Sequence, residues 1–96
     1  GFNCYPAEIE RFMSAHPAIG QIAVIGVPDE RLGEVGKAFV VLRPGKTATE
    51  RELIDWARAN IANFKVPRSI EFRDALPTSP QGKVVKDQLR AQASQA

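Results

Sequence analysis

Apolar side chains recur at helical spacing near the start of the chain. In the segment 6–16, Ile9, Phe12 and Met13 fall at positions i, i+3 and i+4, which form one stripe on a helix. A proline at the first position suits a helix start, because its missing N–H has no helical partner there. Pro17 ends the helix, since the residue before a proline avoids the helical backbone region. We therefore expect a first amphipathic helix between residues 6 and 16.

The sequence predicts two further helices after residue 48. Thr49 and Glu52 form a capping box, in which the hydroxyl and the carboxylate each accept a backbone N–H at the helix start. The apolar face that follows consists of Leu53, Ile54, Ala57 and Ile61, with Trp56 beside it. Near the end of the chain, Val85 and Leu89 stand four residues apart and predict a weaker helix over residues 85–92.

Three short segments have the pattern of β-strands. Residues 22–27 and 38–42 are apolar runs rich in β-branched side chains, which is typical of strands buried on both faces. The first run should stop at Pro28, and the charged loop 29–34 is short enough to make the two strands antiparallel neighbours. Residues 70–73 alternate between apolar and charged and predict a third, half-exposed strand.

The predicted elements follow the order α-β-β-α-β-α, which makes the fold class α+β: a small mixed three-stranded sheet with three helices. The order of the strands within the sheet does not follow from the sequence. A chain of 96 residues has room for one domain, which we expect to span residues 1–92 with a frayed tail at 93–96. Because the chain does not begin with methionine, we expect it to be part of a longer protein.

Composition and charge exclude several classes of protein. Lys and Arg number 13 against 11 Asp and Glu, and both signs are interleaved, so we expect no nucleic-acid partner. No apolar run has the roughly 18 residues of a membrane span and no secretory signal is visible, so we expect a cytoplasmic protein without a transmembrane segment. Cys4 and His16 are the single cysteine and the single histidine, too few for a structural zinc site, and we expect no metal site.

A lysine that follows a glycine near the end of the chain is the first candidate for chemistry. Gly82-Lys83 is not a phosphate-binding P-loop, because Pro77 stands where that motif needs glycine and Val84 where it needs serine or threonine. What remains is a loop with one long, charged side chain, which could meet negative charge in a neighbouring active site. The alternative is a lysine that is simply solvated at the surface.

Two other loops carry candidates that are open to a simpler interpretation. Gly33 either lets a ligand approach the backbone closely or only serves the geometry of the turn. Phe64 stands close to two cations, Lys65 and Arg68, a combination that can stack a nucleobase and hold phosphates. The alternative for this second loop is a core phenylalanine with solvated cations.

Six short motifs follow one another along residues 2–92. In order, they are Asn3-x-Tyr5-Pro6-Ala7-Glu8-Ile9-Glu10, His16-Pro17-Ala18-Ile19, the run from Val24 to Glu34, Ala38-Phe39-Val40-Val41, Phe64-Lys65-Val66-Pro67, and Leu76-Pro77-Thr78-x-x-x-Gly82-Lys83-Val84. Together they resemble the C-terminal domain of the adenylate-forming superfamily, which includes acyl-CoA synthetases, aryl-CoA ligases, firefly luciferase and the adenylation domains of peptide synthetases. The opening motif is more similar to the acyl-CoA and fatty-acid ligase branch.

The resemblance implies part of an ATP-dependent acid–CoA ligase. Such an enzyme converts a carboxylic acid and Mg-ATP into an acyl-adenylate and pyrophosphate, and the CoA thiol then displaces AMP. In this family the C-terminal domain is a mobile lid on a larger N-terminal domain, and it presents opposite faces to one active site in the two half-reactions. The expected partners are therefore that N-terminal domain, ATP, CoA and a carboxylic acid. The fragment alone should be inactive and should bind no cofactor tightly.

The resemblance also implies a role for the lysine in adenylation. Lys83, with Gly82 before it, is similar to the family's adenylation lysine, whose ammonium offsets the charge that builds at the α-phosphate. Its context is similar to that in which bacterial relatives are acetylated, so a lysine acetyltransferase and a deacetylase are possible partners. Acetylation would remove the charge and stop the first half-reaction. Gln81 departs from the Ser, Asn or Ala that relatives often carry there, and we expect it to be tolerated.

For the CoA half-reaction, the resemblance implicates residues on the other two loops. Leu32 and Gly33 are similar to the residues that line the pantetheine tunnel, where a side chain at position 33 would block passage. Phe64 is similar to the residue that stacks on the CoA adenine, with Lys65 and Arg68 near the phosphates. The family's hinge residue and the hairpin that precedes this domain would fall before Gly1.

Two other functions stay open. One is a free-standing module that binds a nucleotide or an acidic partner through cations, namely Lys65, Arg68, Lys83 and Lys86. The other is the C-terminal part of a peptide-synthetase adenylation domain.

Overall fold

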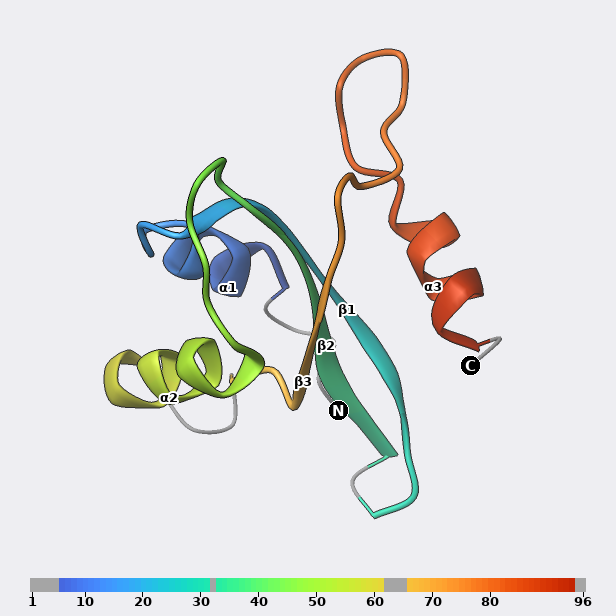
Figure 1. Cartoon of the computed structure of the whole chain (residues 1–96). Coiled ribbons are helices and arrows are strands. Elements are labelled where there is room, and N and C mark those ends of the chain that lie inside the picture. The colour runs from blue at the N-terminus through green and yellow to red at the C-terminus, as the bar shows by residue number, and fades with distance from the viewer. Residues whose placement is uncertain (1–5, 32, 62–65, 95–96) are drawn as a thin grey trace.

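The chain folds around one mixed β-sheet, with helices on both of its faces (Figure 1). This computed structural model describes residues 6–31, 33–61 and 66–94. In chain order the elements are α1 (Pro6–Met13), β1 (Ile19–Asp29), β2 (Gly33–Leu42), α2 (Glu50–Asn60), β3 (Ser69–Phe72) and α3 (Lys86–Ser94). The order α-β-β-α-β-α confirms the predicted fold class.

The sheet has the strand order β1-β2-β3, so β2 lies in the centre. Strands β1 and β2 are antiparallel, as predicted, with Asp29 opposite Gly33 at the turn. Strand β3 runs parallel to β2, from Ser69 beside Lys37 onward. A parallel pair needs a crossover connection, and α2 provides it. The chain therefore leaves β3 in the direction in which β2 ends.

Strands β1 and β2 are longer than the sequence predicted, and the expected end of the first at Pro28 is wrong. Pro28 lies within β1 and stands opposite Glu34. β1 is an edge strand, where a proline can sit because its missing N–H need not belong to a ladder. The pair formed by Asp29 and Gly33 shortens the loop expected at residues 29–34 to the residues between these two.

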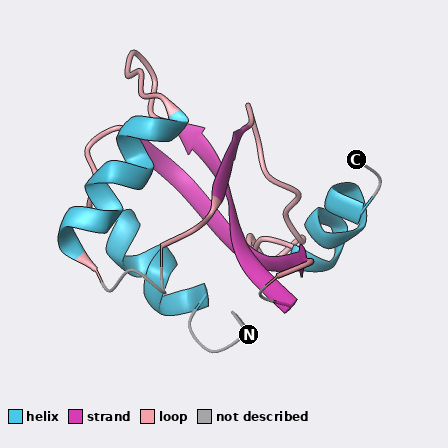
Figure 2. Ribbon diagram, turned by 90° about the horizontal axis from the view of Figure 1, so that it is seen from below, coloured by secondary structure: helices cyan, strands magenta, loops and turns pink. Residues whose placement is uncertain are grey.

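The two faces of the sheet carry separate hydrophobic clusters. Helices α1 and α2 lie on one face and α3 on the other (Figure 2). The larger cluster lies under α1 and α2 and contains Ile9, Met13, Ile19, Val24, Ala38, Val40, Leu53, Ala57, Val66 and Ile70. The smaller cluster lies under α3 and contains Ala23, Ile25, Phe39, Leu76 and Leu89. The predicted burial of the β-strands on both faces is therefore confirmed at their centres.

Helix α2 begins as the sequence predicted. The Thr49 hydroxyl accepts the N–H of Glu52 at 3.1 Å, and the Glu52 carboxylate accepts the N–H of Thr49 at 3.0 Å. Trp56 docks this helix against α1, with its ring centroid 5.2 Å from that of Phe12 and 5.1 Å from that of His16. His16, three residues after the end of α1, thus contacts α2 through Trp56. None of the described helices is long and apolar enough to cross a membrane.

Both outer edges of the sheet receive a glutamate side chain. Glu10 of α1 accepts the backbone N–H of Val24 on β1 at 2.7 Å. Glu50 of α2 accepts the backbone N–H of Ile70 on β3 at 2.7 Å. Edge strands present N–H groups that no neighbouring strand pairs, and a carboxylate satisfies such a group with a charge-assisted hydrogen bond. These two contacts tie α1 and α2 to opposite edges of the sheet.

Candidate functional site

Residues 77–85 form a small hairpin that projects away from the sheet (Figure 1). Its two legs are joined by an isolated bridge between Thr78 and Val84. At the base, the N–H of Val85 donates to the carbonyl of Pro77 at 2.8 Å, and nearer the tip the N–H of Ser79 donates to the carbonyl of Lys83 at 2.7 Å. We call this segment the Lys83 hairpin.

The turn of the Lys83 hairpin follows directly from its sequence. The N–H of Gly82 donates to the carbonyl of Ser79 at 2.9 Å, which closes a four-residue turn. Serine first, proline second and glycine fourth is the preference of a type I turn. Gly82 has a φ of +85°, where an L side chain is strained, although a Cβ there would meet no atom within 4 Å. Position 82 therefore needs glycine for its backbone and not for space.

Lys83 directly follows that turn and is exposed. Its backbone is fixed, because its carbonyl accepts the N–H of Ser79 and its own N–H donates to the Ser79 hydroxyl at 3.3 Å. Among the described residues, no carboxylate forms an ion pair with its ammonium. The arrangement presents an exposed cation on a backbone that is held by hydrogen bonds.

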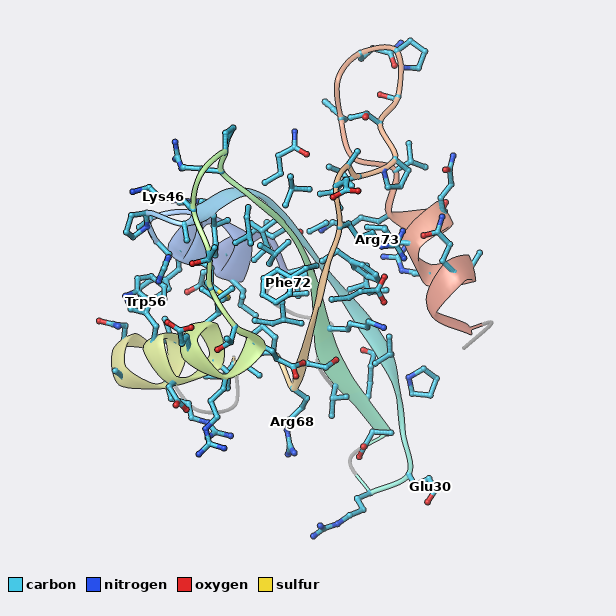
Figure 3. The ribbon with its side chains drawn as sticks, in the orientation of Figure 1. Glu30, Lys46, Trp56, Arg68, Phe72 and Arg73 are labelled. Carbon is cyan, nitrogen blue, oxygen red and sulfur yellow. The ribbon has the colours of Figure 1, made fainter. Side chains whose placement is uncertain are left out.

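Two other candidates lie at the end of the sheet where β1 turns into β2, which we call the turn end. Gly33 is exposed, with a φ of +80° and open space around the position of a Cβ. Arg68 is exposed and points away from the sheet (Figure 3). The N–H of Arg68 donates to the carbonyl of Gly36 at 2.8 Å, which places it beside the first residues of β2. Leu32, Phe64 and Lys65 lie outside the described residues.

The Lys83 hairpin and the turn end lie at opposite ends of the molecule (Figure 1). Gly33 begins β2, whereas the hairpin follows β3, which runs parallel to β2 and toward its far end. A strand of ten residues spans about 30 Å at the usual rise per residue. Arg68 and Lys83 therefore do not form one binding surface, which counts against a single-site module built from both.

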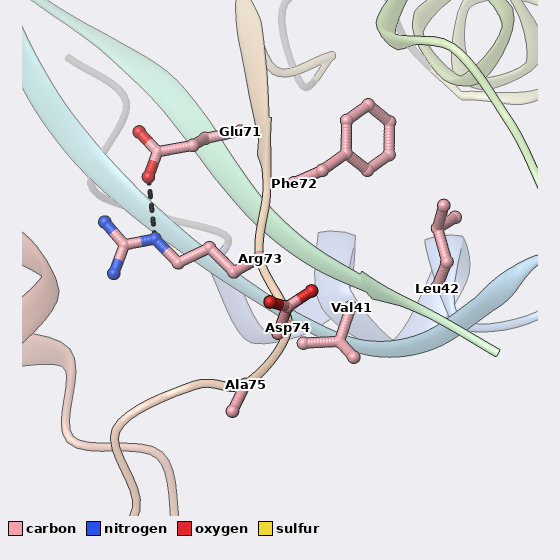
Figure 4. Close-up of a pocket in the computed structure, with 7 residues that line it drawn as sticks. All are labelled: Val41, Leu42, Glu71, Phe72, Arg73, Asp74 and Ala75. Carbon is pink, nitrogen blue, oxygen red and sulfur yellow. Dashed lines mark hydrogen bonds and ion pairs between the residues drawn. The ribbon is translucent and has the colours of Figure 1, made fainter. Parts of the chain in front are cut away.

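An open groove of about 590 Å³ lies along β3 (Figure 4). It is lined by Val41, Leu42, Glu71, Phe72, Arg73, Asp74 and Ala75. Glu71 and Arg73 stand on one side of the strand, with 2.6 Å between the Arg73 Nε and the Glu71 Oε2, and Phe72 stands on the other. Phe72 is 37% exposed, which matches the predicted half-exposed strand.

The surroundings of Glu71 change the pKa of its carboxyl. Burial raises the pKa of its carboxyl, but hydrogen bonds from Arg73 and Lys37 and their charges outweigh burial, so the pKa lies below its ordinary value of 4.5. Because the folded protein holds the charged form more strongly than the unfolded chain does, Glu71 stabilises the fold above that value. This contribution is lost as the pH falls through the lowered pKa.

We therefore expect Glu71→Gln to reduce the dependence of stability on pH below about 4.5. The free energy of unfolding is measured by urea titration of the isolated domain at several pH values, with the fluorescence of Trp56 as the signal. The variant should be less stable than the parent chain at neutral pH, and the difference should shrink as the medium becomes acidic. A difference that is the same at every pH would contradict the electrostatic origin. Arg58→Gln, which removes an exposed cation of α2, is the control.

One contact beside the Lys83 hairpin was not predicted in the sequence analysis. Lys86, the first residue of α3, places its ammonium 2.8 Å from Oε2 of Glu10 on α1. A lysine in the first turn of a helix faces the positive end of the helix dipole, which is an unfavourable position. The unfavourable position of this charge was the one sign in the sequence that Lys86 needs an acidic partner.

No group of three His, Cys, Asp or Glu among the described residues could hold a metal ion.

The chain is similar in sequence to the end of several CoA ligases. It is 52% identical over 90 residues to a propanoyl:CoA ligase of Rhodococcus jostii whose substrate carries a methyl-dioxo-octahydroindenyl group, and 49% identical over 90 residues to a feruloyl-CoA synthase of Amycolatopsis. It is 46% identical over 89 residues to a long-chain-fatty-acid–CoA ligase of Bacillus subtilis. These matches cover 93–94% of this chain but only 16–18% of each relative.

Solved structures agree with these relatives. Apo MatB from Rhodopseudomonas palustris is similar with a TM-score of 0.90 and 40% identity, over 99% of this chain and 19% of that one. A fatty acyl CoA synthetase of Mycobacterium tuberculosis is similar with a TM-score of 0.87 and 37% identity, over 95% of this chain and 18% of that one. The sequence profile of the AMP-binding enzyme C-terminal domain matches residues 8–83. The chain belongs to the family of C-terminal domains of AMP-binding enzymes.

Proposed function

We propose that this chain is the lid domain of an ATP-dependent acid–CoA ligase, and that Lys83 is its contribution to the adenylation half-reaction. The observation that carries the proposal is the exposed lysine on a projecting hairpin, held by backbone hydrogen bonds, in a domain of this family. A domain that spans less than a fifth of its relatives has little active site of its own. It acts by presenting side chains such as Lys83 to the rest of the parent enzyme.

In adenylation, a carboxylate oxygen of the acid attacks the α-phosphorus of Mg-ATP and pyrophosphate leaves. Negative charge builds on the oxygens around that phosphorus in the transition state. An ammonium held at that point offsets the charge at no cost of reorganisation during the reaction. Lys83 suits this role because its backbone is fixed by Ser79 while the residue itself is exposed. Mg-ATP and the acid are substrates here, and the larger part of the enzyme holds them.

In the second half-reaction, the CoA thiol attacks the acyl carbon and AMP leaves. We assign Leu32 and Gly33 to the pantetheine path of this step, and Phe64, Lys65 and Arg68 to the adenine and phosphates of CoA. Of these residues, Gly33 and Arg68 lie at the turn end of the domain. The support is the open space around the Cβ position of Gly33 and the exposed cation at Arg68. Because this end lies opposite the Lys83 hairpin, the domain has to turn between the two half-reactions.

Lys83 is also the amine at which we expect control by acetylation. It is exposed, and it lies on a loop that an acetyltransferase could reach. Acetylation would remove the charge on which the adenylation step depends. If the domain instead belongs to a peptide synthetase, Lys83 has the same role in adenylation and only the acceptor of the acyl group differs.

The proposal is tested on the full-length parent protein. With a panel of carboxylic acids, the parent should catalyse acid-dependent exchange of pyrophosphate into ATP and should release CoA thioesters. A parent truncated before this domain should lose both activities, and the isolated domain should show neither. Exchange that survives the truncation unchanged would contradict the proposal.

A further inference from the structure

The Lys83 hairpin is held to the body of the domain on both sides of its turn. Leu76, directly before the hairpin, is 6% exposed and lies in the cluster under α3, and Val84, in the second leg of the hairpin, packs against the same cluster. Leu89 of α3 is fully buried there. These contacts are apolar and lack direction, so they hold the hairpin on the sheet without fixing its angle.

A directional contact is supplied by Lys86, three residues after Lys83. Its ammonium lies 2.8 Å from Oε2 of Glu10, and the side chains of Lys86 and Glu10 are 29% and 21% exposed. The same oxygen accepts the N–H of Val24 at 2.7 Å, and Val24 is fully buried. The hydrogen bond from Val24 thus holds the Glu10 carboxylate on β1, independently of its ion pair with Lys86. The ion pair connects the base of the hairpin to the β1 edge of the sheet.

The position of Lys86 in its helix supports a role beyond stability. At the first residue of α3 a cation faces the positive end of the helix dipole, whereas an acidic or neutral residue there would favour the helix. A fixed carboxylate on another element compensates for this position. The contact joins α1 and α3, which lie on opposite faces of the sheet, around the β1 edge (Figure 2).

We propose that Glu10 and Lys86 are a positioning pair that sets the angle of the Lys83 hairpin for adenylation; this inference rests on the proposed function of Lys83. Lys83 is joined to Lys86 through two residues whose backbone is tied to the other leg, so a rotation of α3 is passed to the hairpin. A displacement of about 1 Å at a reacting group can cost on the order of 10²-fold in rate. The pair acts through Lys83 and does not touch the substrates.

The test uses the full-length enzyme and measures each half-reaction separately. Lys86→Gln removes the cation and should lower kcat of pyrophosphate exchange by about tenfold or more, with KM for ATP and for the acid changed less than about twofold. Formation of CoA thioester from supplied acyl-adenylate should keep its rate. Lys86→Arg should restore most of the exchange, because a guanidinium can bind the same carboxylate. Arg90→Gln removes another cation of α3, paired with Asp87 on its own helix, and is the matched control.

A double-mutant cycle assigns the effect to the pair. Glu10→Gln keeps an acceptor for the N–H of Val24 but removes the charge that Lys86 binds. The double variant Glu10→Gln, Lys86→Gln should be no slower than Lys86→Gln alone within about twofold, since both changes break one contact. If the fold-losses in exchange of the two single variants multiply in the double variant, Glu10 and Lys86 do not act through one shared contact.

Two further outcomes would overturn the inference. A purely structural contact would lower both half-reactions together and reduce the thermal unfolding temperature in proportion. Unchanged exchange in Lys86→Gln would also refute the pair, while the loss of exchange in Lys83→Ala, measured beside it, would show that the proposed function still stands. If Lys83→Ala keeps full exchange, the proposed function itself is wrong and the inference falls with it.

Discussion

Replacing Lys83 with alanine in the full-length enzyme should slow adenylation by about 10²–10³-fold, the cost of removing one preorganised donor, about 2.7–4 kcal/mol. The loss should appear in kcat, because the ammonium meets charge that develops only in the transition state. Thioester formation from supplied acyl-adenylate should continue at nearly its original rate. Single-turnover assays of each half-reaction measure both quantities. The fold should be unaffected, since the Lys83 side chain is exposed and its hairpin is held by backbone contacts.

Lys46→Ala is the matched control for this prediction. Lys46 is also exposed and also lies in a loop, but it stands on another part of the surface (Figure 3). It should leave both half-reactions unchanged. Equal losses in the two half-reactions of Lys83→Ala would contradict the assignment of this lysine to one step.

The second large effect is expected at Gly33. Gly33→Leu should leave adenylation nearly intact and should strongly reduce transfer of the acyl group to CoA. Within the domain a side chain at this position meets nothing within 4 Å, so it would extend into the path that we assign to pantetheine. The φ of +80° adds backbone strain of about 1–2 kcal/mol, which lowers the stability of the domain. Pyrophosphate exchange and CoA-thioester release separate the two steps.

Gly45 provides the control that separates strain from obstruction. It has a φ of +77° and open space around the position of its Cβ, as Gly33 does, but it lies in the loop between β2 and α2. Gly45→Leu should therefore lower stability by a similar amount and leave CoA transfer unchanged. If Gly33→Leu transfers acyl groups to CoA as fast as Gly45→Leu does, position 33 is not on the path of CoA.

The elements with strong local signals could be predicted from the sequence. The capping box of Thr49 and Glu52 gave the start of α2, because its hydrogen bonds involve neighbouring residues alone. The apolar stripe with Ile9 and Met13 gave α1. The strand ends could not be predicted, because the position of Pro28 depends on β1 being an edge strand. Whether a strand lies at the edge or in the centre of the sheet depends on pairing between residues that are far apart in the sequence.

For the candidate site, single residues could be selected from the sequence, but their arrangement in space could not be predicted. Lys83 and Gly82 could be selected because a glycine followed by a lysine stands in a loop near the end of the chain. The separation of Lys83 from Gly33 by the length of the sheet depends on the parallel pairing of β3 with β2, which no local pattern contains. The contact between Glu10 and Lys86 joins residues that are far apart in the sequence. Such a contact requires the tertiary fold before it can be seen.

On the proposed function, Lys83 enters the ATP site of the parent enzyme for adenylation. The most direct measurement is the rate at which an amine-acetylating reagent labels Lys83 in the full-length enzyme, compared by mass spectrometry with the rate at the exposed Lys46. Bound to a non-hydrolysable ATP analogue and the acid, the enzyme should protect Lys83 and leave Lys46 reactive, whereas the isolated domain should protect neither. Equal labelling of the two lysines in every state of the full-length enzyme would contradict the account.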